Sequence, residues 1–336
     1  MIKPTIICLT PVKNERWILD RFLRCASLWA DYIIVADQNS DDGSREIALR
    51  HEKVTLIENR SNNFNQGVQQ KLLIDAAREI PEPRILIALD ADEMLTANVM
   101  NHPEWKTLLN APPGTIGELQ WVNILPNFKS YWWDSKCDFH YPVIFVDDGS
   151  DYIGNMIHCS RIPEPSFASR IRLKSIKLLH YSYAEWKRNE SKQRWYQCWE
   201  KINRPSQSSV RLCRSYNSAL IFPSDEIFSL KQEWFTNYEE KDIDMTSVYQ
   251  EGIYWRDKQI LQWMAEHGSA KFNKLAIWDF DWSALAIKLN VSDCGDGYKD
   301  SRGWPEKLLH VWLKKTQPFR KKLVIRITDK ILEIFF

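Results

Sequence analysis

Two carboxylates stand one residue apart behind an apolar run, in Asp90-Ala91-Asp92-Glu93 after residues 84–89. Carboxylates at the carboxyl end of a buried strand form a hard-oxygen site, which suits Mg²⁺ or Mn²⁺ carrying the phosphates of a nucleotide. Magnesium keeps several waters and needs only one or two protein carboxylates, so a sparse site is sufficient. These residue types therefore predict an enzyme that handles an activated nucleotide.

The elements that must position these carboxylates alternate between strand and helix patterns. Strands are expected at 5–9, 32–36, 54–57 and 84–89, and helices at 18–29, 44–48 and 68–80, with Ser44 capping the second helix. This alternation predicts an α/β fold with a mostly parallel, Rossmann-like sheet flanked by helices, whose ligands lie beyond the carboxyl ends of the strands. The polar loops 10–15, 37–43 and 90–93 should meet there.

The second half of the chain is less regular and richer in aromatic residues. Further strands are expected at 117–124, 143–146 and 176–179, and a helix rich in Trp, Lys and Arg at 184–202. Residues 201–209, with Pro205 and three serines, are the best linker candidate. We therefore expect a catalytic domain at 1–205, whose acceptor part begins near residue 110, and a mainly helical, Trp-rich region at 206–336.

Composition excludes several classes of protein. Lys and Arg total 45 against 44 for Asp and Glu, so no overall basic field favours a nucleic-acid partner. The seven cysteines are odd in number and contain no CxxC pair, which is typical of reduced thiols and predicts a cytoplasmic protein. The chain starts without a signal-peptide pattern and contains no apolar run of about 18 residues, so it is not expected to cross a membrane.

The loop after the first strand argues against two other nucleotide or phosphate enzymes. A dinucleotide-binding loop needs glycines at this point, whereas residues 10–15 contain none. A phosphatase of the haloacid dehalogenase type would carry its DxD after the first strand, and here the DxD follows the fourth. The remaining possibility is a fold that binds its nucleotide through the first two loops and its phosphates through a metal at the DxD.

An ordered set of motifs over residues 5–185 resembles the family 2 glycosyltransferases, which have the GT-A fold and include the lipopolysaccharide-core type. The motifs are Thr10-Pro11-Val12-Lys13-Asn14-Glu15, Asp37-Gln38-Asn39-Ser40-Asp41-Asp42-Gly43-Ser44, Asn65-Gln66-Gly67 and Leu89-Asp90-Ala91-Asp92-Glu93. The resemblance implies a nucleotide-sugar donor, most commonly a UDP-sugar, a divalent metal (Mn²⁺ or Mg²⁺), and inversion at the anomeric centre.

The resemblance also implies roles for individual residues. Residues matching Pro11 and Glu15 line the nucleoside, and the one matching Asp37 accepts a hydrogen bond from the base. Asp92 matches the metal ligand, while Asp90 matches the carboxylate that faces the ribose or the donor sugar. Thr10 and Ala91 are expected to bind the donor beside them. Lys71, one turn inside the third helix, could neutralise a phosphate, although a solvated helix lysine is the more common case.

The acceptor side should supply a general base, because an inverting transfer needs a group that takes the proton of the acceptor hydroxyl. The segment 152–159 resembles one that in relatives ends in His-Glu, but here Cys159 occupies the Glu position. Asp151 and His158 are the predicted catalytic residues, with Asp138 and Glu164 as further alternatives. His180 matches a histidine that completes the metal or diphosphate site in some GT-A enzymes; a structural hydrogen bond is the alternative.

Residues 306–336 carry a separate signal, with eight basic and three acidic residues. Between residues 323 and 335 the apolar side chains share one face of a predicted helix and the polar ones the opposite face. A basic amphipathic helix can lie on an anionic bilayer at the inner face of the cytoplasmic membrane. Packing on its own domain, or on a second subunit in a homodimer, remains the alternative.

The sequence thus predicts a metal-dependent, inverting hexosyltransferase that moves a sugar from a nucleotide diphosphate to a saccharide or lipid-linked saccharide of the cell envelope. Two alternatives from other classes stay open. A sugar-nucleotide pyrophosphorylase shares the sheet type, but would be expected to open with a glycine-rich loop. A non-catalytic carbohydrate-binding or scaffold protein with a degenerate site is favoured only by Cys159.

Overall fold

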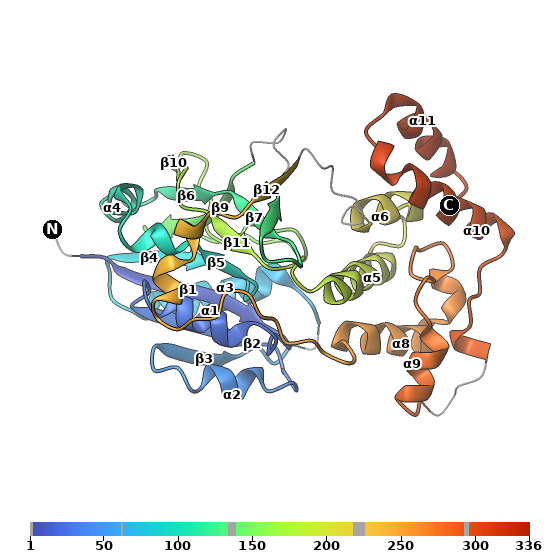
Figure 1. Cartoon of the computed structure of the whole chain (residues 1–336), viewed down its shortest axis with the longest axis horizontal. Helices are drawn as coiled ribbons and strands as arrows, with labels where there is room; N and C mark the ends of the chain where they lie inside the picture. Colours follow the sequence, from blue (N-terminus) through green and yellow to red (C-terminus); the bar gives the residue numbers. More distant parts are fainter. Residues whose placement is uncertain (1–2, 62, 134–138, 218–225, 292–295) are drawn as a thin grey trace. The chain divides into compact units, whose positions relative to one another are not determined.

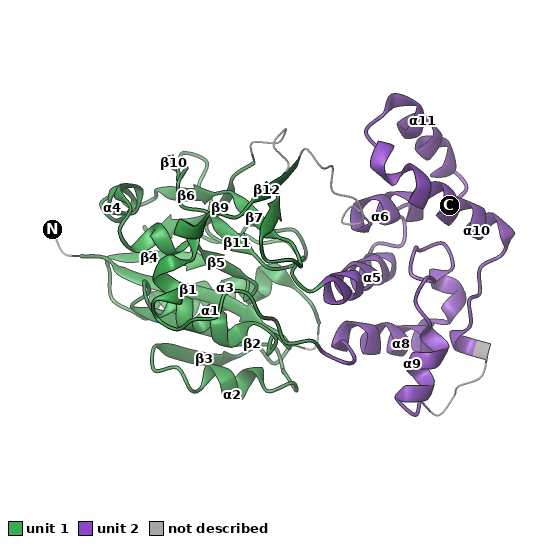
Figure 2. Ribbon diagram, viewed as in Figure 1, with its two compact units in different colours: residues 1–185, 225–250 green, residues 186–224, 251–336 purple. Residues whose placement is uncertain are grey.

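The computed structural model describes residues 3–61, 63–133, 139–217, 226–291 and 296–336 (Figure 1). The chain divides into two compact units, coloured separately in Figure 2. Unit 1 comprises Met1–Glu185 and Asp225–Gln250, and unit 2 comprises Trp186–Ser224 and Glu251–Phe336. The division after Glu185 differs from the boundary at 205 expected from the sequence. Residues 201–209 run from the end of one helix of unit 2 to the start of the next and are not a linker between the units.

The main sheet of unit 1 contains seven strands in the described part of the chain, in the order β10-β6-β9-β4-β1-β2-β3. β3, β2, β1 and β4 run parallel, while β9 pairs antiparallel with both β4 and β6. This confirms the predicted α/β fold with a mainly parallel sheet. The strands are β1 (Thr5–Val12), β2 (Tyr32–Asp37), β3 (Val54–Glu58), β4 (Arg84–Ala88), β6 (Ile116–Leu119), β9 (Tyr141–Val146) and β10 (Arg170–Arg172).

The two faces of this sheet belong to different apolar clusters, because successive side chains of a strand point to opposite faces. In β1, Ile6 and Cys8 join the cluster that contains α1, whereas Ile7 and Leu9 join the cluster that contains α3. Helices therefore cover both faces, as the buried strands require. The helices of this part are α1 (Leu19–Ala26), α2 (Ser44–Ala48), α3 (Gln66–Arg78) and α4 (Pro103–Leu109).

The cap of α2 differs from the expectation. Gly43, with φ +99°, occupies the N-cap position, and Ser44 is the first residue of the helix. The Ser44 hydroxyl instead accepts a bond from the Glu15 amide and donates to Asp42. The prediction that Ser44 caps the helix is therefore wrong, because a left-handed turn at Gly43 moves the helix start by one residue.

A second sheet of five described strands has the order β12-β8-β7-β11-β5. Its strands are β5 (Glu93–Leu95), β7 (Trp121–Ile124), β8 (Ser130–Trp132), β11 (Leu178–His180) and β12 (Ile227–Ser229). The single strand expected at 117–124 is thus two strands, since the chain leaves the main sheet after β6 and enters the second sheet as β7. β5 pairs antiparallel with β11, so that His180 stands opposite Glu93.

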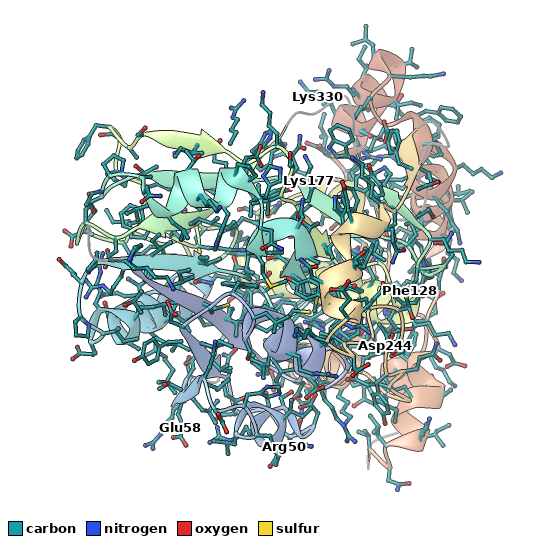
Figure 3. All side chains as sticks on the ribbon, turned by 60° about the vertical axis from the view of Figure 1, so that its left-hand side comes forward. Arg50, Glu58, Phe128, Lys177, Asp244 and Lys330 are labelled. Carbon is teal, nitrogen blue, oxygen red and sulfur yellow. The ribbon has the colours of Figure 1, made fainter. Side chains whose placement is uncertain are left out.

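The segment 226–250 returns to unit 1 after the first helices of unit 2. It includes β12 and α7 (Thr236–Glu239). Tyr238 is buried and donates to the Leu95 carbonyl, and Arg21 of α1 donates to the carbonyls of Asp244 (labelled in Figure 3) and Ser247. The core of unit 1 is therefore completed by residues distant in the sequence.

Unit 2 is helical in its described residues. Its α-helices are α5 (Trp186–Asn203), α6 (Ser209–Tyr216), α8 (Trp255–His267), α9 (Trp282–Lys288), α10 (Trp304–Thr316) and α11 (Leu323–Leu332). The tryptophans of α5 and α8 form an aromatic cluster in which Trp195 contacts Trp199, Trp255 and Trp263. None of the helices in the described ranges combines the length and the apolar character needed to span a bilayer.

Candidate functional site

The first two predicted loops are joined by hydrogen bonds beyond the ends of β1 and β2. The side chain of Asn14 exchanges two bonds with Asp41, of 2.8 and 2.9 Å, and the Asn14 amide donates to the Ser40 hydroxyl. Asn14 adopts φ +55°, a conformation that Asn tolerates better than most residues. These bonds make one rigid layer from loops that are 26 or more residues apart in the sequence.

Asp37 lies at the end of β2 with its side chain 1% exposed. Its Oδ2 atom accepts from Arg45 at 2.8 Å and from the Ser40 amide at 3.2 Å. Its Oδ1 atom is buried and has no hydrogen-bond partner in the described structure, and the same holds for the Thr10 hydroxyl in neighbouring β1. A buried acceptor without a partner is costly, so Asp37 is suited to accept a bond from a ligand.

The third loop follows β4, which pairs with β1 on the side opposite β2. Asp90 therefore leaves the sheet two strands away from Asp37, at the same carboxyl edge. The Asp90 amide donates to Glu93, whose side chain is fully buried at the start of β5. The three loops expected to meet at this edge are thus on adjacent strands.

Arg161 is the residue that sequence reasoning missed. Its guanidinium bonds to Asp90 Oδ2 at 2.8 Å and makes a close ion pair with Glu93. Burial opposes the charged form, but Asp90 and Glu93 outweigh it and hold the pKa of Arg161 above its usual range. The only signal in the sequence was a basic residue two positions after Cys159, which motif comparison passed over.

Asp92 and His180 are brought together by the pairing of β5 with β11. His180 Nε2 lies 3.8 Å from Asp92 Oδ2, and both side chains are about one-tenth exposed. His180 Nδ1 is 2.7 Å from Asn123 Oδ1, and the Asn123 amide nitrogen donates to the Trp132 carbonyl. Asn123 therefore presents its oxygen to Nδ1, which must carry a proton. Nε2, the atom nearest Asp92, is then the nitrogen with a lone pair at neutral charge.

An aromatic stack lies beside both Arg161, the partner of Asp90 and Glu93, and His180, the neighbour of Asp92. The Trp121 ring lies between Tyr141, at 3.6 Å between centroids, and His180, at 4.6 Å. The Arg161 guanidinium lies 6.0 Å from the same ring. The Trp121 indole nitrogen is buried without a hydrogen-bond partner in the described structure. Trp121 thus has both faces covered by protein, and a ligand would meet only its edge.

The segment 153–159 lies against the start of α3. Gln66 and Gly67 donate their amides to the carbonyls of Met156 and Asn155, both at 2.9 Å. A Cβ atom on Gly67 would stand 2.7 Å from the Gly154 backbone, so the two chains approach as closely as glycines permit. His158, at φ +55°, donates its amide to the Gln66 side chain at 2.6 Å. Asn65-Gln66-Gly67 therefore positions the predicted acceptor segment.

Other predicted residues are not part of these contacts. Lys71 Nζ forms an ion pair with Asp75 one turn further along α3, and both side chains are more than half exposed. Asp151 is exposed, and Glu164 pairs with Arg170 at 2.7 Å. The Cys159 sulfur accepts a bond from Tyr152 at 3.4 Å. Asp138 lies outside the described residues.

Glu226 is a further carboxylate that the sequence did not single out. It is buried directly before β12 and accepts a bond from Trp132 Nε1 at 3.1 Å. Trp132 also contacts Tyr183, whose ring lies 6.3 Å from that of His180. Pairing of β12 with β8 thus brings a carboxylate from the returning segment toward the aromatic residues around His180.

Comparisons with known proteins give a limited result. No family model and no curated protein matches the chain. A solved 4-diphosphocytidyl-2C-methyl-D-erythritol synthase shares 13% identity over 43% of this chain and 76% of its own, with a TM-score of 0.30. A cytidylyltransferase from Leptospira borgpetersenii shares 15% identity over 37% of this chain and 58% of its own, with a TM-score of 0.25. A mannose-1-phosphate geranyltransferase from Thermus thermophilus shares 17% identity over 45% of this chain and 51% of its own, with a TM-score of 0.26.

These TM-scores are too low to carry an argument about activity. The fold class rests on the observed strand order and pairing, which define an α/β protein with a mainly parallel sheet. In the described ranges there is no group of three or more His, Cys, Asp or Glu side chains arranged to hold a metal ion. Any metal site at Asp92 and His180 would therefore need ligands from elsewhere.

Proposed function

We propose that this chain is a metal-dependent, inverting glycosyltransferase that takes a sugar from a nucleotide diphosphate and transfers it to a saccharide or lipid-linked saccharide. The observation that carries the proposal is the buried Asp37 Oδ1 atom, without a partner in the described structure, at the same sheet edge as Asp90 and Asp92. Ligands of α/β sheets bind at such an edge. The motif resemblance supplies the reaction type.

The nucleoside would occupy the layer formed by the first two loops. Asp37 would accept the N–H of the base, and the Thr10 hydroxyl could donate to the same ligand. Pro11 and Glu15 would line the nucleoside; Glu15 is held by a 2.6 Å bond from Trp17 Nε1. Burial of Asp37 supports selectivity, because a base without a matching N–H would leave the carboxylate unpaired.

The metal would be held by Asp92 and His180. Arg161 pairs with Asp90 and Glu93, whereas Asp92 lies beside the imidazole of His180, so Asp92 would be the carboxylate of the DxD that shares a cation with that ring. One carboxylate and one imidazole ligand suit Mn²⁺ better than Mg²⁺, which prefers oxygen ligands. Phosphates and water would be the further ligands. When bound, the metal would stabilise the negative charge that develops on the diphosphate leaving group.

The general base stays a prediction. Asp151 and His158 are the candidates from the sequence, and the contacts of Glu226 with Trp132 add a third. A base acts on the acceptor hydroxyl, so exchanging it for a neutral isostere should abolish transfer while leaving nucleotide binding intact. Separate Asp151→Asn, His158→Gln and Glu226→Gln variants would identify it, because only one should show this combination.

The test is thermal stabilisation by a panel of nucleoside diphosphates, each with and without Mn²⁺. We expect one nucleotide to raise the Tm only when metal is present, because a ligand of the folded state stabilises it. Asp92→Ala should remove this metal-dependent shift. Asp75→Ala, which removes an exposed carboxylate of α3 paired only with Lys71 in the described structure, is the matched control and should keep the shift. Equal shifts in both variants would rule out the Asp92 site.

Product analysis separates the proposal from its alternatives. A glycosyltransferase releases nucleoside diphosphate from a nucleotide sugar, whereas a sugar-nucleotide pyrophosphorylase releases pyrophosphate from a nucleoside triphosphate and a sugar phosphate. The glycine-free loop 10–15 favours the first reaction. Binding of glycan without turnover of any nucleotide would instead support a carbohydrate-binding protein.

A further inference from the structure

The helix α11 exposes its apolar side and buries a charged residue. Six large apolar side chains of residues 323–335 are between 52% and 77% exposed: Leu323, Val324, Ile327, Ile331, Ile334 and Phe335. At about 100° per residue, the first four fall within one face of α11 (Leu323–Leu332), and Ile334 and Phe335 lie in the turn that follows the helix. We call this set the outer apolar face. A helix on the surface of a soluble domain normally turns such a face toward the core.

The opposite side of α11 packs on other helices of unit 2 through polar and apolar contacts. Asp329 is 8% exposed and accepts two 2.8 Å bonds from the Arg214 guanidinium. Leu332 and Phe336 pack against the small core formed with α6 and α10. A buried carboxylate and guanidinium held in a bidentate pair set the rotation of the helix. The outward direction of the apolar face therefore follows from specific contacts.

Basic residues accompany the outer apolar face. Residues 306–336 carry eight Lys or Arg and three acidic residues, and Asp329 and Glu333 face Arg214 and Arg211 of α6. Arg326 and Lys330 are exposed on α11, next to the apolar face in the helical projection. Lys330 is labelled in Figure 3. Lys321 and Lys322 directly precede it. The exposed charge around this face is thus positive.

The preceding helix shows the same pattern. Trp304, Leu308 and Val311 of α10 are spaced at i, i+4 and i+7 and are 75%, 60% and 50% exposed. Leu309 and Leu313 supply the buried side of that helix. Lys315 lies on the exposed side, one turn beyond Val311. Two successive helices therefore each expose an apolar row accompanied by lysine, although each already has a buried side.

We propose that the outer apolar face of α11, with the exposed row of α10, docks on the surface of an anionic lipid bilayer. The combination of aliphatic side chains with exposed Lys and Arg fits a layer of lipid chains below negatively charged headgroups. The charge argues against a second copy of the chain as the occupant, because Lys is depleted from the cores of protein interfaces and two such faces would repel. Contact at the bilayer surface needs no spanning helix.

The full chain should be mixed with vesicles of phosphatidylcholine alone or with about one-third phosphatidylglycerol, without substrate, and bound protein measured by flotation. We expect at least a roughly tenfold stronger partition onto the anionic vesicles, weakening with salt, because charged contacts near the surface are screened. Ile327→Asp with Ile331→Asp should lower partition about tenfold or more. Arg326→Gln with Lys330→Gln should remove the preference for anionic lipid while retaining some apolar binding.

Ile287→Asp is the matched control, since Ile287 of α9 is 65% exposed in the same unit but lies outside the face. It should bind vesicles as the unchanged chain does. The proposal is overturned if the chain ignores anionic vesicles, or if the Ile327 and Ile331 changes have no greater effect than Ile287→Asp. If sedimentation shows that the chain is a dimer, and Ile327→Asp with Ile331→Asp converts it to a monomer, the face is instead a subunit interface. None of these readings depends on transferase activity.

Discussion

At the scale of single residues, the acidic cluster of the DxD carries its own compensating charge. Three acidic side chains follow one strand within four positions, and one of them, Glu93, is fully buried. Arg161 supplies the compensating charge and occupies the oxygens of Asp90 and Glu93 that face it. Asp92 lies beside His180, so the three carboxylates have different surroundings.

Replacing Arg161 with Met should destabilise unit 1 by about 3 kcal/mol, because it leaves the buried Glu93 without its guanidinium partner. Arg60→Met removes an ion pair at the surface, with Arg60 86% exposed, and should cost less than about 0.5 kcal/mol. Urea denaturation followed by circular dichroism measures both. Adding Glu93→Gln to Arg161→Met should recover part of the loss, since the uncompensated charge is removed. Equal effects of Arg161→Met and Arg60→Met would show that Arg161 does not compensate Glu93.

At the scale of elements, the four parallel strands were predictable, because short apolar runs that alternate with segments of helical periodicity are typical of a parallel sheet. The change of sheet between β6 and β7 was not, since residues 117–124 have the pattern of one continuous strand and contain no sign of where its hydrogen-bond partners change. The ion pair of Arg161 with Asp90 joins residues 71 positions apart, and no local pattern records such a pair. The resemblance therefore pointed to Asp37, Asp92 and His180, whose roles stay predictions, but it gave no sign of Arg161.

The contact between α3 and the segment 153–159 depends on two glycines. Gly67→Ala would improve helix propensity by up to about 1 kcal/mol, but its Cβ would stand 2.7 Å from the Gly154 carbonyl carbon and 2.8 Å from its oxygen. Backbone atoms cannot move aside cheaply, so we expect a net loss of about 2 kcal/mol and displacement of the segment. Hydrogen exchange at residues 153–159 should increase.

The control for this change is Gly252→Ala. A Cβ at Gly252 meets nothing within 4 Å, and its backbone has no positive φ. It should leave stability within about 0.5 kcal/mol of the unchanged chain. If Gly67→Ala were as well tolerated, the close approach of the two glycines could not be what holds the segment on α3.

At the scale of the whole molecule, unit 1 is discontinuous in sequence. The chain leaves it after Glu185, forms α5 and α6 in unit 2, and returns for residues 225–250. The sequence suggested a boundary at 205 because Pro205 and its serines have the composition of a linker. Composition indicates local flexibility, but it cannot show that a later segment packs into a core formed earlier in the chain. The departure after Glu185 and the return at residues 225–250 were therefore visible only in the structure.

The returning segment should be essential for the fold of unit 1. It buries Tyr238, Ile243 and Met245 in the main core. Its carbonyls also accept the hydrogen bonds of Arg21; without the segment, this guanidinium would lie among apolar side chains. Residues 1–185 alone should therefore lack a cooperative thermal transition. Joining residue 185 to residue 226 by a flexible Gly-Ser linker and ending at 250 should restore that transition, because the core is then complete. Calorimetry distinguishes the two chains. A cooperative transition of equal midpoint in residues 1–185 alone would mean that the segment covers the core without being needed to form it.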